Sequence, residues 1–283
     1  MPTSNASLPL RHPLPDLAQW TALFQAAEIP VLAETAEALE LLRDNEDAVD
    51  ANSLGEMIAT DPLMTLKVLV YSAKVAARRS SGLLTDVETV TAALVLMGIT
   101  PFFREFGPQP TVEDRLADHP QALDGLRRVL RRAERSARFA LGFAIHRLDP
   151  DAAVLHSAAM LHDLAEMLLW VHAPDLALQL DARRLAEPQA RTSVLQRELL
   201  HVDLSELEQS LMTAWHLPEL LAHMTDDKRA NDPQVQSVML AVRLARHTTD
   251  SWDNAAVPDD LTAIGILLNT RPEHTLKLLH EFD

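Results

Sequence analysis

One segment near the middle of the chain combines residue types that could do chemistry. Residues 155–166 place His162 and Asp163 side by side in an otherwise largely apolar run of Leu, Ala and Met. An imidazole nitrogen and a carboxylate oxygen both bind divalent metals, and a bound metal can activate water for hydrolysis. A catalytic metal needs three or more protein ligands and an open position. The pair alone is therefore not a metal site, and a hydrogen-bonded, partly buried polar pair is the competing interpretation.

Two further residues could complete a ligand set. Glu166 lies one helical turn beyond His162, although the same i,i+4 spacing is common in ordinary helix-surface pairs. His201 is the other candidate, although a histidine at a helix end is also favoured by the helix dipole. The remaining histidines show no pairing with a matching carboxylate at metal-ligand spacing. We expect no cofactor, and keep His162, Asp163, Glu166 and His201 as an alternative, atypical ligand set.

The elements that position these residues are predicted to be helices. Leu, Ala, Val and Met supply most of the apolar residues, and Ala, Leu and Met have high helix propensities. Only 7 glycines occur in 283 residues, which leaves few of the tight turns that hairpins need. Strict apolar–polar alternation never lasts long enough to indicate a strand. The predicted fold is all-α, with two packed helical halves.

Composition also limits the compartment and the partners. The chain has no cysteine, which excludes disulfides and thiolate metal sites and fits a reducing cytoplasm. Its net charge of −16 disfavours general binding to nucleic acid, because such binding depends on Lys and Arg. The longest uncharged run, residues 89–103, is too short to cross a membrane. We expect a cytoplasmic protein that contacts neither a membrane nor nucleic acid in general.

The chain divides near its middle. Residues 1–13 are predicted to form a disordered leader, followed by an N-terminal helical half over 14–110 and a C-terminal half over 120–283. Three prolines between residues 107 and 120 mark the boundary. A long helix is expected over 121–147.

Local signals predict where several helices begin and end. Asp61-Pro62 has a capping carboxylate followed by a proline, which suits the first helical position. Capping boxes are expected at 53–56 and 85–88, and Gly98 is expected to end the helix that the second box opens.

A basic stripe follows the long predicted helix. It is either a docking surface for an acidic or phosphorylated ligand, or a solvated face that pairs with the chain's own carboxylates. Its members are Arg127, Arg128, Arg131, Arg132, Arg135 and Arg138.

Several short motifs follow one another along the chain in an order that is more specific than any one of them. The chain has Ile29-Pro30-Val31-Leu32, then an Asp-Pro step at residues 61–62, and an apolar helix that ends in a Met-Gly turn at residues 97–98. His162-Asp163 follows within Met-Leu-His-Asp-Leu, and Trp215-His216-Leu217-Pro218 comes later. The resemblance that these motifs carry, over roughly residues 28–250, is to the HDOD family, the HD-related output domain of bacteria. It implies a compact helical domain related to HD phosphohydrolases, usually found in signalling proteins and generally non-catalytic.

The chain also departs from the metal-binding pattern of active HD enzymes. Arg135 stands where the resemblance places a histidine ligand, and Arg246 stands where it places a later aspartate. Residues 224–227, Met-Thr-Asp-Asp, replace a double histidine of the cyclic-dinucleotide phosphodiesterases. The resemblance therefore implies that His162 and Asp163 are vestigial. We expect Arg135 and Arg246 to pair with Asp163 in place of a metal.

The sequence predicts a non-catalytic bacterial signalling or regulatory module that acts by binding a protein partner or a small ligand. A nucleotide-sensing variant of this prediction has an anionic nucleotide bound by Arg135, Arg138 or Arg246. The alternative is a metal-dependent phosphohydrolase or phosphodiesterase with the atypical ligand set.

Overall fold

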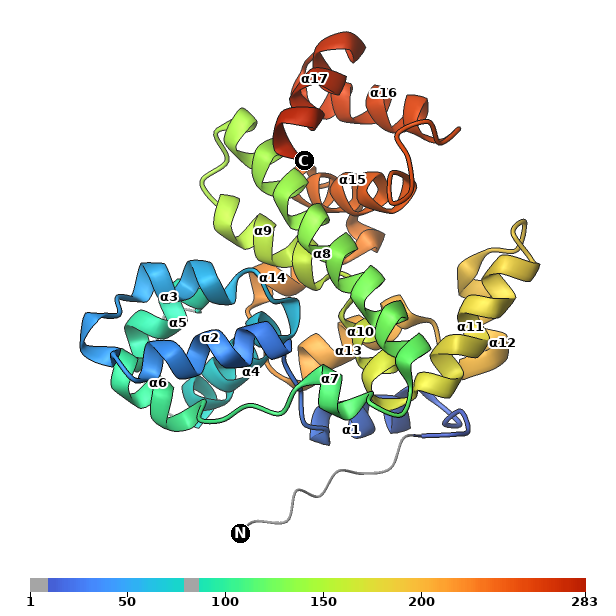
Figure 1. Cartoon of the computed structure of the whole chain (residues 1–283). Helices are drawn as coiled ribbons and strands as arrows, with labels where there is room; N and C mark the ends of the chain where they lie inside the picture. The colour runs from blue at the N-terminus through green and yellow to red at the C-terminus, as the bar shows by residue number, and fades with distance from the viewer. Residues whose placement is uncertain (1–9, 79–86) are drawn as a thin grey trace.

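The computed structural model describes residues 10–78 and 87–283. Within these ranges the regular structure is helical, and the only β-type contact is an isolated bridge between Val31 and Thr111. The all-α prediction is confirmed. The helices, shown in Figure 1, are α1 (Leu17–Ala26), α2 (Ala33–Arg43), α3 (Ala51–Ile58), α4 (Pro62–Arg78), α5 (Val90–Met97), α6 (Ile99–Glu105), α7 (Val112–Arg115), α8 (Pro120–Arg147), α9 (Ala152–Leu161), α10 (Leu164–His172), α11 (Pro174–Ala186), α12 (Thr192–Leu200), α13 (Leu204–Ala214), α14 (Glu219–Met224), α15 (Pro233–His247), α16 (Val257–Leu268) and α17 (Pro272–Phe282), with short 3-10 turns η1 (Glu46–Ala48) and η2 (Asp227–Arg229).

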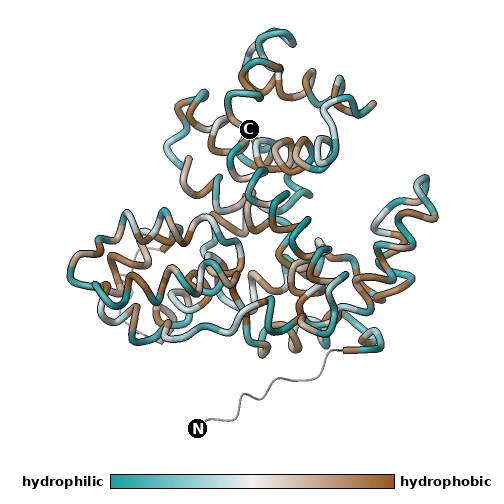
Figure 2. Tube along the Cα trace, viewed as in Figure 1, coloured by the Kyte–Doolittle hydropathy of each residue, from teal (hydrophilic) through white to brown (hydrophobic). Residues whose placement is uncertain are grey.

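Two hydrophobic cores organise these helices. Helices α2 to α6 form a lobe around the smaller core, drawn blue to teal in Figure 1. The larger core joins α1 to the helices from α7 onward. In Figure 2 the apolar positions alternate with polar ones along most helices, as expected where each helix buries one stripe. Helix α4 serves both cores, because Leu63 and Leu66 enter the larger one while Met64 and Val68 enter the smaller one.

Asp61 fixes the start of α4. Its buried carboxylate accepts hydrogen bonds from the backbone N–H groups of Leu63 and Met64, at 2.8 and 3.1 Å. The other oxygen accepts from the backbone N–H of Leu32 at 2.9 Å, just before α2. The predicted cap at Asp61-Pro62 is therefore present, and it also ties the starts of two helices together.

The other local predictions have mixed outcomes. Gly98 does end α5, with φ of +85°, a conformation that suits glycine. The capping box predicted at 53–56 is wrong, because α3 begins one residue after Asp50, whose carboxylate accepts from the backbone N–H groups of residues 52 and 53. Thr85 of the other predicted box lies outside the described residues, and α5 is capped by Thr89.

Helix α8 confirms the long helix predicted over 121–147, and it is the longest helix of the described residues. It crosses the middle of the molecule (Figure 1). It packs against α9, α10, α11, α15 and α17. Two glycines allow α8 to approach its neighbouring helices closely. Gly125 lies against the ring of Trp170 in α10, and Gly142 lies against Phe282 in α17. A side chain at either position would overlap those rings.

The N-terminal part of the described chain packs on the C-terminal half. Trp20 and Phe24 of α1 are buried in the larger core, and α1 lies on α13. The indole N–H of Trp20 donates to the carbonyl of Leu200 at 2.9 Å. Residues 17–26 therefore do not share the smaller core with the rest of the predicted half 14–110. Of the predicted leader, residues 1–9 lie outside the described residues, whereas the backbone N–H of Leu10 donates to the carbonyl of His172 at 2.9 Å.

Residues 152–172 are long and apolar enough to cross a membrane by composition alone. They comprise α9, the His162-Asp163 turn and α10, and 78% of their most apolar window is buried inside the protein. The apolar residues of this segment are therefore explained by their packing within the larger core.

The contact between α8 and α10 can be tested at Gly125. We expect Gly125→Ala to lower the free energy of unfolding by about 1–3 kcal/mol, because the added methyl group must displace the Trp170 ring. Gly107→Ala is the matched control, since a methyl group there meets no atom within 4 Å. Urea unfolding of both variants measures the difference. Equal stabilities would show that Trp170 does not pack on Gly125.

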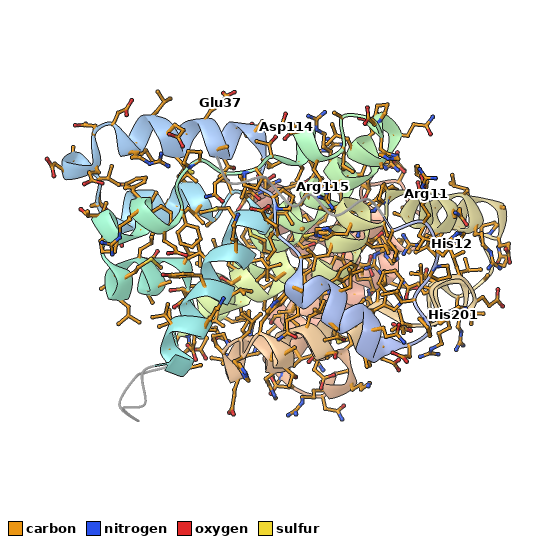
Figure 3. All side chains as sticks on the ribbon, turned by 90° about the horizontal axis from the view of Figure 1, so that it is seen from below. Arg11, His12, Glu37, Asp114, Arg115 and His201 are labelled. Carbon is orange, nitrogen blue, oxygen red and sulfur yellow. The ribbon has the colours of Figure 1, made fainter. Side chains whose placement is uncertain are left out.

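His172 gives the fold a pH dependence. Burial, with a smaller effect from Arg115, lowers the pKa of His172 to about 4 (Arg115 is labelled in Figure 3). Below the unfolded-state pKa of about 6.5 the unfolded chain binds a proton that the folded chain does not. Neutral His172 therefore makes its full contribution to the free energy of unfolding above pH 6.5. About 3 kcal/mol of this contribution is lost as the pH falls from 6.5 towards 4.

We expect His172→Phe to flatten this part of the curve of unfolding free energy against pH. His274→Gln, at an exposed position, should keep the wild-type slope. Denaturant unfolding at intervals between pH 4 and 7 gives the curves. A His172→Phe slope equal to that of the wild type would show that His172 is not the group that titrates.

Candidate functional site

His162 and Asp163 lie at the turn between α9 and α10. Helix α9 ends at Leu161 and α10 begins at Leu164, so the pair interrupts an otherwise buried apolar segment. The flanking residues anchor both helices in the larger core, where they pack on α8, α13 and α15. The polar pair is therefore held where several helices meet, with side chains only 10% and 12% exposed.

Arg132 of α8 holds the carboxylate side of this turn. Its Nη2 and Nε atoms donate to Oδ2 of Asp163 at 2.6 and 3.0 Å, and Nη2 also donates to Oε2 of Glu166 at 2.9 Å. Arg184 donates to the other oxygen of Glu166 at 2.7 Å, and Arg246 approaches Oδ1 of Asp163 at 3.3 Å. Two carboxylates are thus surrounded by three guanidinium groups.

Mutual attraction keeps this network charged despite its burial. Burial favours the neutral forms, but the Arg132 and Arg246 guanidiniums hold the pKa of Asp163 well below its usual range. Arg132 and Arg184 similarly lower the pKa of Glu166 against the effect of burial. Burial also opposes the charge on Arg132, yet the two carboxylates raise its pKa further. All three groups are therefore ionised at neutral pH.

The predicted pairing of Arg135 with Asp163 is wrong. Arg135 forms a two-pronged ion pair with Asp283, with Nη2 to Oδ2 at 2.6 Å, and donates to the carbonyl of Thr248 at 2.7 Å. Side chains three apart lie on the same face of a helix but one turn apart and about 60° apart around its axis, and the turn of α8 that faces Asp163 carries Arg132. The predicted pairing of Arg246 with Asp163 is confirmed.

The three arginines predicted to bind an anion are each engaged elsewhere. Arg138 pairs with Glu134 on its own helix at 3.0 Å, and Arg135 pairs with Asp283. Arg246 lies 54% exposed beside Asp163. Arg132 was visible in the sequence only as one member of the basic stripe, and no local signal distinguished it from its neighbours.

A second set of groups lies on the other side of His162. Its Nε2 atom is 3.0 Å from Oδ1 of Asp227 in η2, while Nδ1 lies 3.5 Å from Oδ1 of Asp163 without hydrogen-bond geometry. Burial lowers the pKa of His162, but attraction to Glu208 and the contacts with Asp163 and Asp227 raise it well above its usual value. Burial raises the pKa of the Glu208 carboxyl well above its usual range.

These residues do not fit a divalent metal. Among residues 10–78 and 87–283 no cluster of three His, Asp or Glu side chains has the arrangement that a metal ion requires. The Asp163 and Glu166 oxygens that could bind a metal accept instead from Arg132, whose positive charge would repel one.

His201, the other ligand of the atypical set, is not at this site. It ends α12 with φ of +62°, and its Nδ1 atom lies 3.1 Å from the carbonyl oxygen of Leu14. Figure 3 shows it at the same edge of the molecule as His12. The predicted ligand set of four is therefore not assembled, and His201 has the helix-end position that the competing interpretation expected.

A cavity of about 490 Å³ opens beside the pair. Its lining includes the arginine–carboxylate network and also Glu208 and Asp227. Hydroxyl groups of Thr192, Ser193 and Ser205 also line it. Of these cavity residues, sequence reasoning missed Arg132, Arg184 and Glu208, because each is distant in sequence from the His-Asp pair.

Arg132 should be essential to the stability of this site. We expect Arg132→Gln to lower the free energy of unfolding by about 3–5 kcal/mol, because Asp163 and Glu166 then remain buried without their shared cation. Arg128→Gln removes a half-exposed partner of Asp181 on the same helix and should cost less than about 1 kcal/mol. Chemical unfolding measures both. A similar small loss in the two variants would contradict this role.

Comparisons with known proteins agree with the geometry. The chain is similar to the MmoQ response regulator of Methylococcus capsulatus strain Bath, with 19% identity, a TM-score of 0.68, and coverage of 90% of this chain and 99% of that one. It is also similar to a virulence factor of Campylobacter jejuni subsp. jejuni, with 17% identity, a TM-score of 0.60, and coverage of 94% and 98%. None of the curated proteins compared with the chain matches it. The HDOD domain pattern matches residues 29–230, which is most of the chain, and this chain therefore belongs to the HDOD family.

Proposed function

We propose that this protein is a bacterial signalling module that regulates by binding and hydrolyses no phosphodiester. The observation that carries the proposal is the position of Arg132 between Asp163 and Glu166. A guanidinium has no vacant coordination position and cannot lower the pKa of a bound water as a metal does. The site therefore keeps the shape of the HD turn without the means to activate water.

A signalling role is supported by the fold that the chain shares with a response regulator, MmoQ of Methylococcus capsulatus. Regulation by such a module requires a partner protein or a small ligand whose binding favours one state of the domain. We propose a cytoplasmic location, in keeping with the absence of cysteine.

The other two candidate functions receive less support. The metal-dependent phosphohydrolase needs His201 near His162, and His201 instead contacts the segment before α1. The nucleotide sensor needs unpaired cations, and Arg135 and Arg138 are paired with Asp283 and Glu134.

Metal content and turnover test the proposal together. We expect protein purified without chelator to contain no stoichiometric Mn, Fe, Zn or Mg, and its melting temperature to stay unchanged when these ions are added. It should also leave bis(p-nitrophenyl) phosphate intact. Stoichiometric metal with turnover that His162→Ala abolishes would overturn the proposal.

A further inference from the structure

We propose that a cleft between α4 and the segment that joins α6 to α7 binds a small organic anion, an apolar molecule that carries a carboxylate or phosphate group. The cleft has a volume of about 470 Å³ and shares no lining residue with the cavity beside His162. The inference therefore goes beyond the proposed function and does not depend on it. It is carried by three cationic side chains of the lining and by the apolar surface beside them.

The three cations of the cleft come from two helices. Lys67 and Lys74 lie about two turns apart on α4, and Arg104 lies near the end of α6. Within residues 10–78 and 87–283, none of the three forms an ion pair with a carboxylate. They differ in this from the α8 arginines that were predicted to bind an anion, since those are paired. The cleft therefore offers cations that an anionic ligand need not compete for.

Lys67 is half-buried, and its only hydrogen-bond partner among the described residues is neutral. Its ammonium donates to the side-chain amide oxygen of Gln109 at 2.5 Å, and the amide nitrogen of Gln109 donates to the carbonyl of Gly107 at 2.8 Å. Burial lowers the pKa of Lys67, and attraction to Glu28 and Asp61 opposes this effect. An ammonium group has three donors, so two remain after the bond to Gln109. A charged group that is partly removed from water is stabilised by a contacting opposite charge, which an anion in the cleft would supply.

The carboxylates of the lining do not balance its cations. Glu28 and Glu105 are the acidic residues of the lining, and both are exposed to water. The lining thus has three cationic and two acidic side chains, in a protein whose net charge is −16. A local excess of positive charge on so acidic a chain favours an anion over a cation at this place.

An apolar surface lines the rest of the cleft. The rings of Tyr71 and Phe106 lie edge to face with their centroids 5.3 Å apart, and Ile29, Val70 and Pro110 also line the space. Pockets for small molecules are typically apolar with a few polar groups that fix orientation, and a volume of about 470 Å³ lies within their range. The lining therefore suits an anion with an apolar body better than a bare inorganic ion.

The cleft also lies where the chain passes from one core to the other. Ile29 packs in the larger core and Phe106 in the smaller one. The segment between them and α7, visible in Figure 1 as the loop from α6 to α7, is tied to the N-terminal part by the hydrogen bond from the backbone N–H of Val31 to the carbonyl of Pro110, at 3.0 Å. A ligand in the cleft would contact both cores at once, which suits regulation by binding.

Isothermal titration calorimetry of the full chain with benzoate and with phenyl phosphate tests the inference, because the two probes share an apolar ring and differ in their anionic group. We expect at least one of them to bind, and the tighter of the two identifies the group that the cleft prefers. Benzamide has the shape of benzoate without its charge, and inorganic phosphate has charge without a ring, so both should bind more weakly. Equal binding of either control, or failure of both anions at millimolar concentrations, would overturn the inference. Binding of a hexaglutamate peptide in place of both anions would indicate an acidic protein partner and would also overturn it.

Lys67→Met keeps the apolar stem of the side chain and removes its charge, so we expect the affinity for the anion to fall about tenfold. Lys277→Met is the matched control, because Lys277 is exposed on α17 and does not line the cleft. Affinity that is unchanged in Lys67→Met would place the anion elsewhere and would overturn the inference.

A second variant leaves Lys67 in place and reverses the charges at the two exposed positions, Lys74→Glu with Arg104→Glu. It should weaken binding about tenfold or more, while circular dichroism shows an unchanged helical fold. Arg131→Glu with Lys277→Glu makes the same change of net charge at exposed positions outside the cleft and should keep the wild-type affinity. Equal losses in the two double variants would show only a general effect of net charge and would overturn the inference. Phosphodiester turnover would overturn the proposed function alone, whatever the anions do.

Discussion

The rest of the site depends on the contact of one buried guanidinium, that of Arg132, with two carboxylates. Arg132 reaches from α8 to Asp163 and Glu166, and so joins the longest helix to the start of α10. Burying three charged groups is unfavourable unless their geometry is good and their remaining hydrogen-bonding atoms find partners. Arg184 and Arg246 supply those partners from two further helices. The network thereby holds four helices in one arrangement around the His-Asp turn.

A built-in cation differs from a metal in ways that matter for function. A metal can leave, exchange its water and polarise a substrate, whereas the Arg132 side chain is part of α8 and remains charged at any physiological pH. The same positive charge that stabilises the HD turn also occupies the oxygens through which chemistry would proceed. In the proposed function this arrangement stabilises the turn and does not activate water.

The two ring nitrogens of His162 face different groups. On the side of Asp163 the carboxylates accept from guanidinium groups, while on the other side the imidazole contacts Asp227. Buried atoms without a hydrogen-bond partner occur on both sides: Arg184 Nε, His162 Nδ1 and Glu208 Oε1. The unpaired atoms thus include nitrogen atoms as well as a carboxyl oxygen.

The sequence alone determined the helical class and the family, because these depend on helix propensity, on capping at Asp61 and Gly98, and on motifs of adjacent residues. It placed His162 and Asp163 within a helix, which is wrong, because they form the turn between α9 and α10. It also identified Arg246 as a partner of Asp163. Only the tertiary structure decided that Arg132 rather than Arg135 faces Asp163, since both lie on one stripe and the rotation of α8 is set by its packing. The same holds for Glu208, which reaches the cavity through the docking of α13 on α10. Local patterns specify elements, but the pairing of charges distant in the chain depends on which faces of the helices meet in the core, and short-range sequence signals do not encode this.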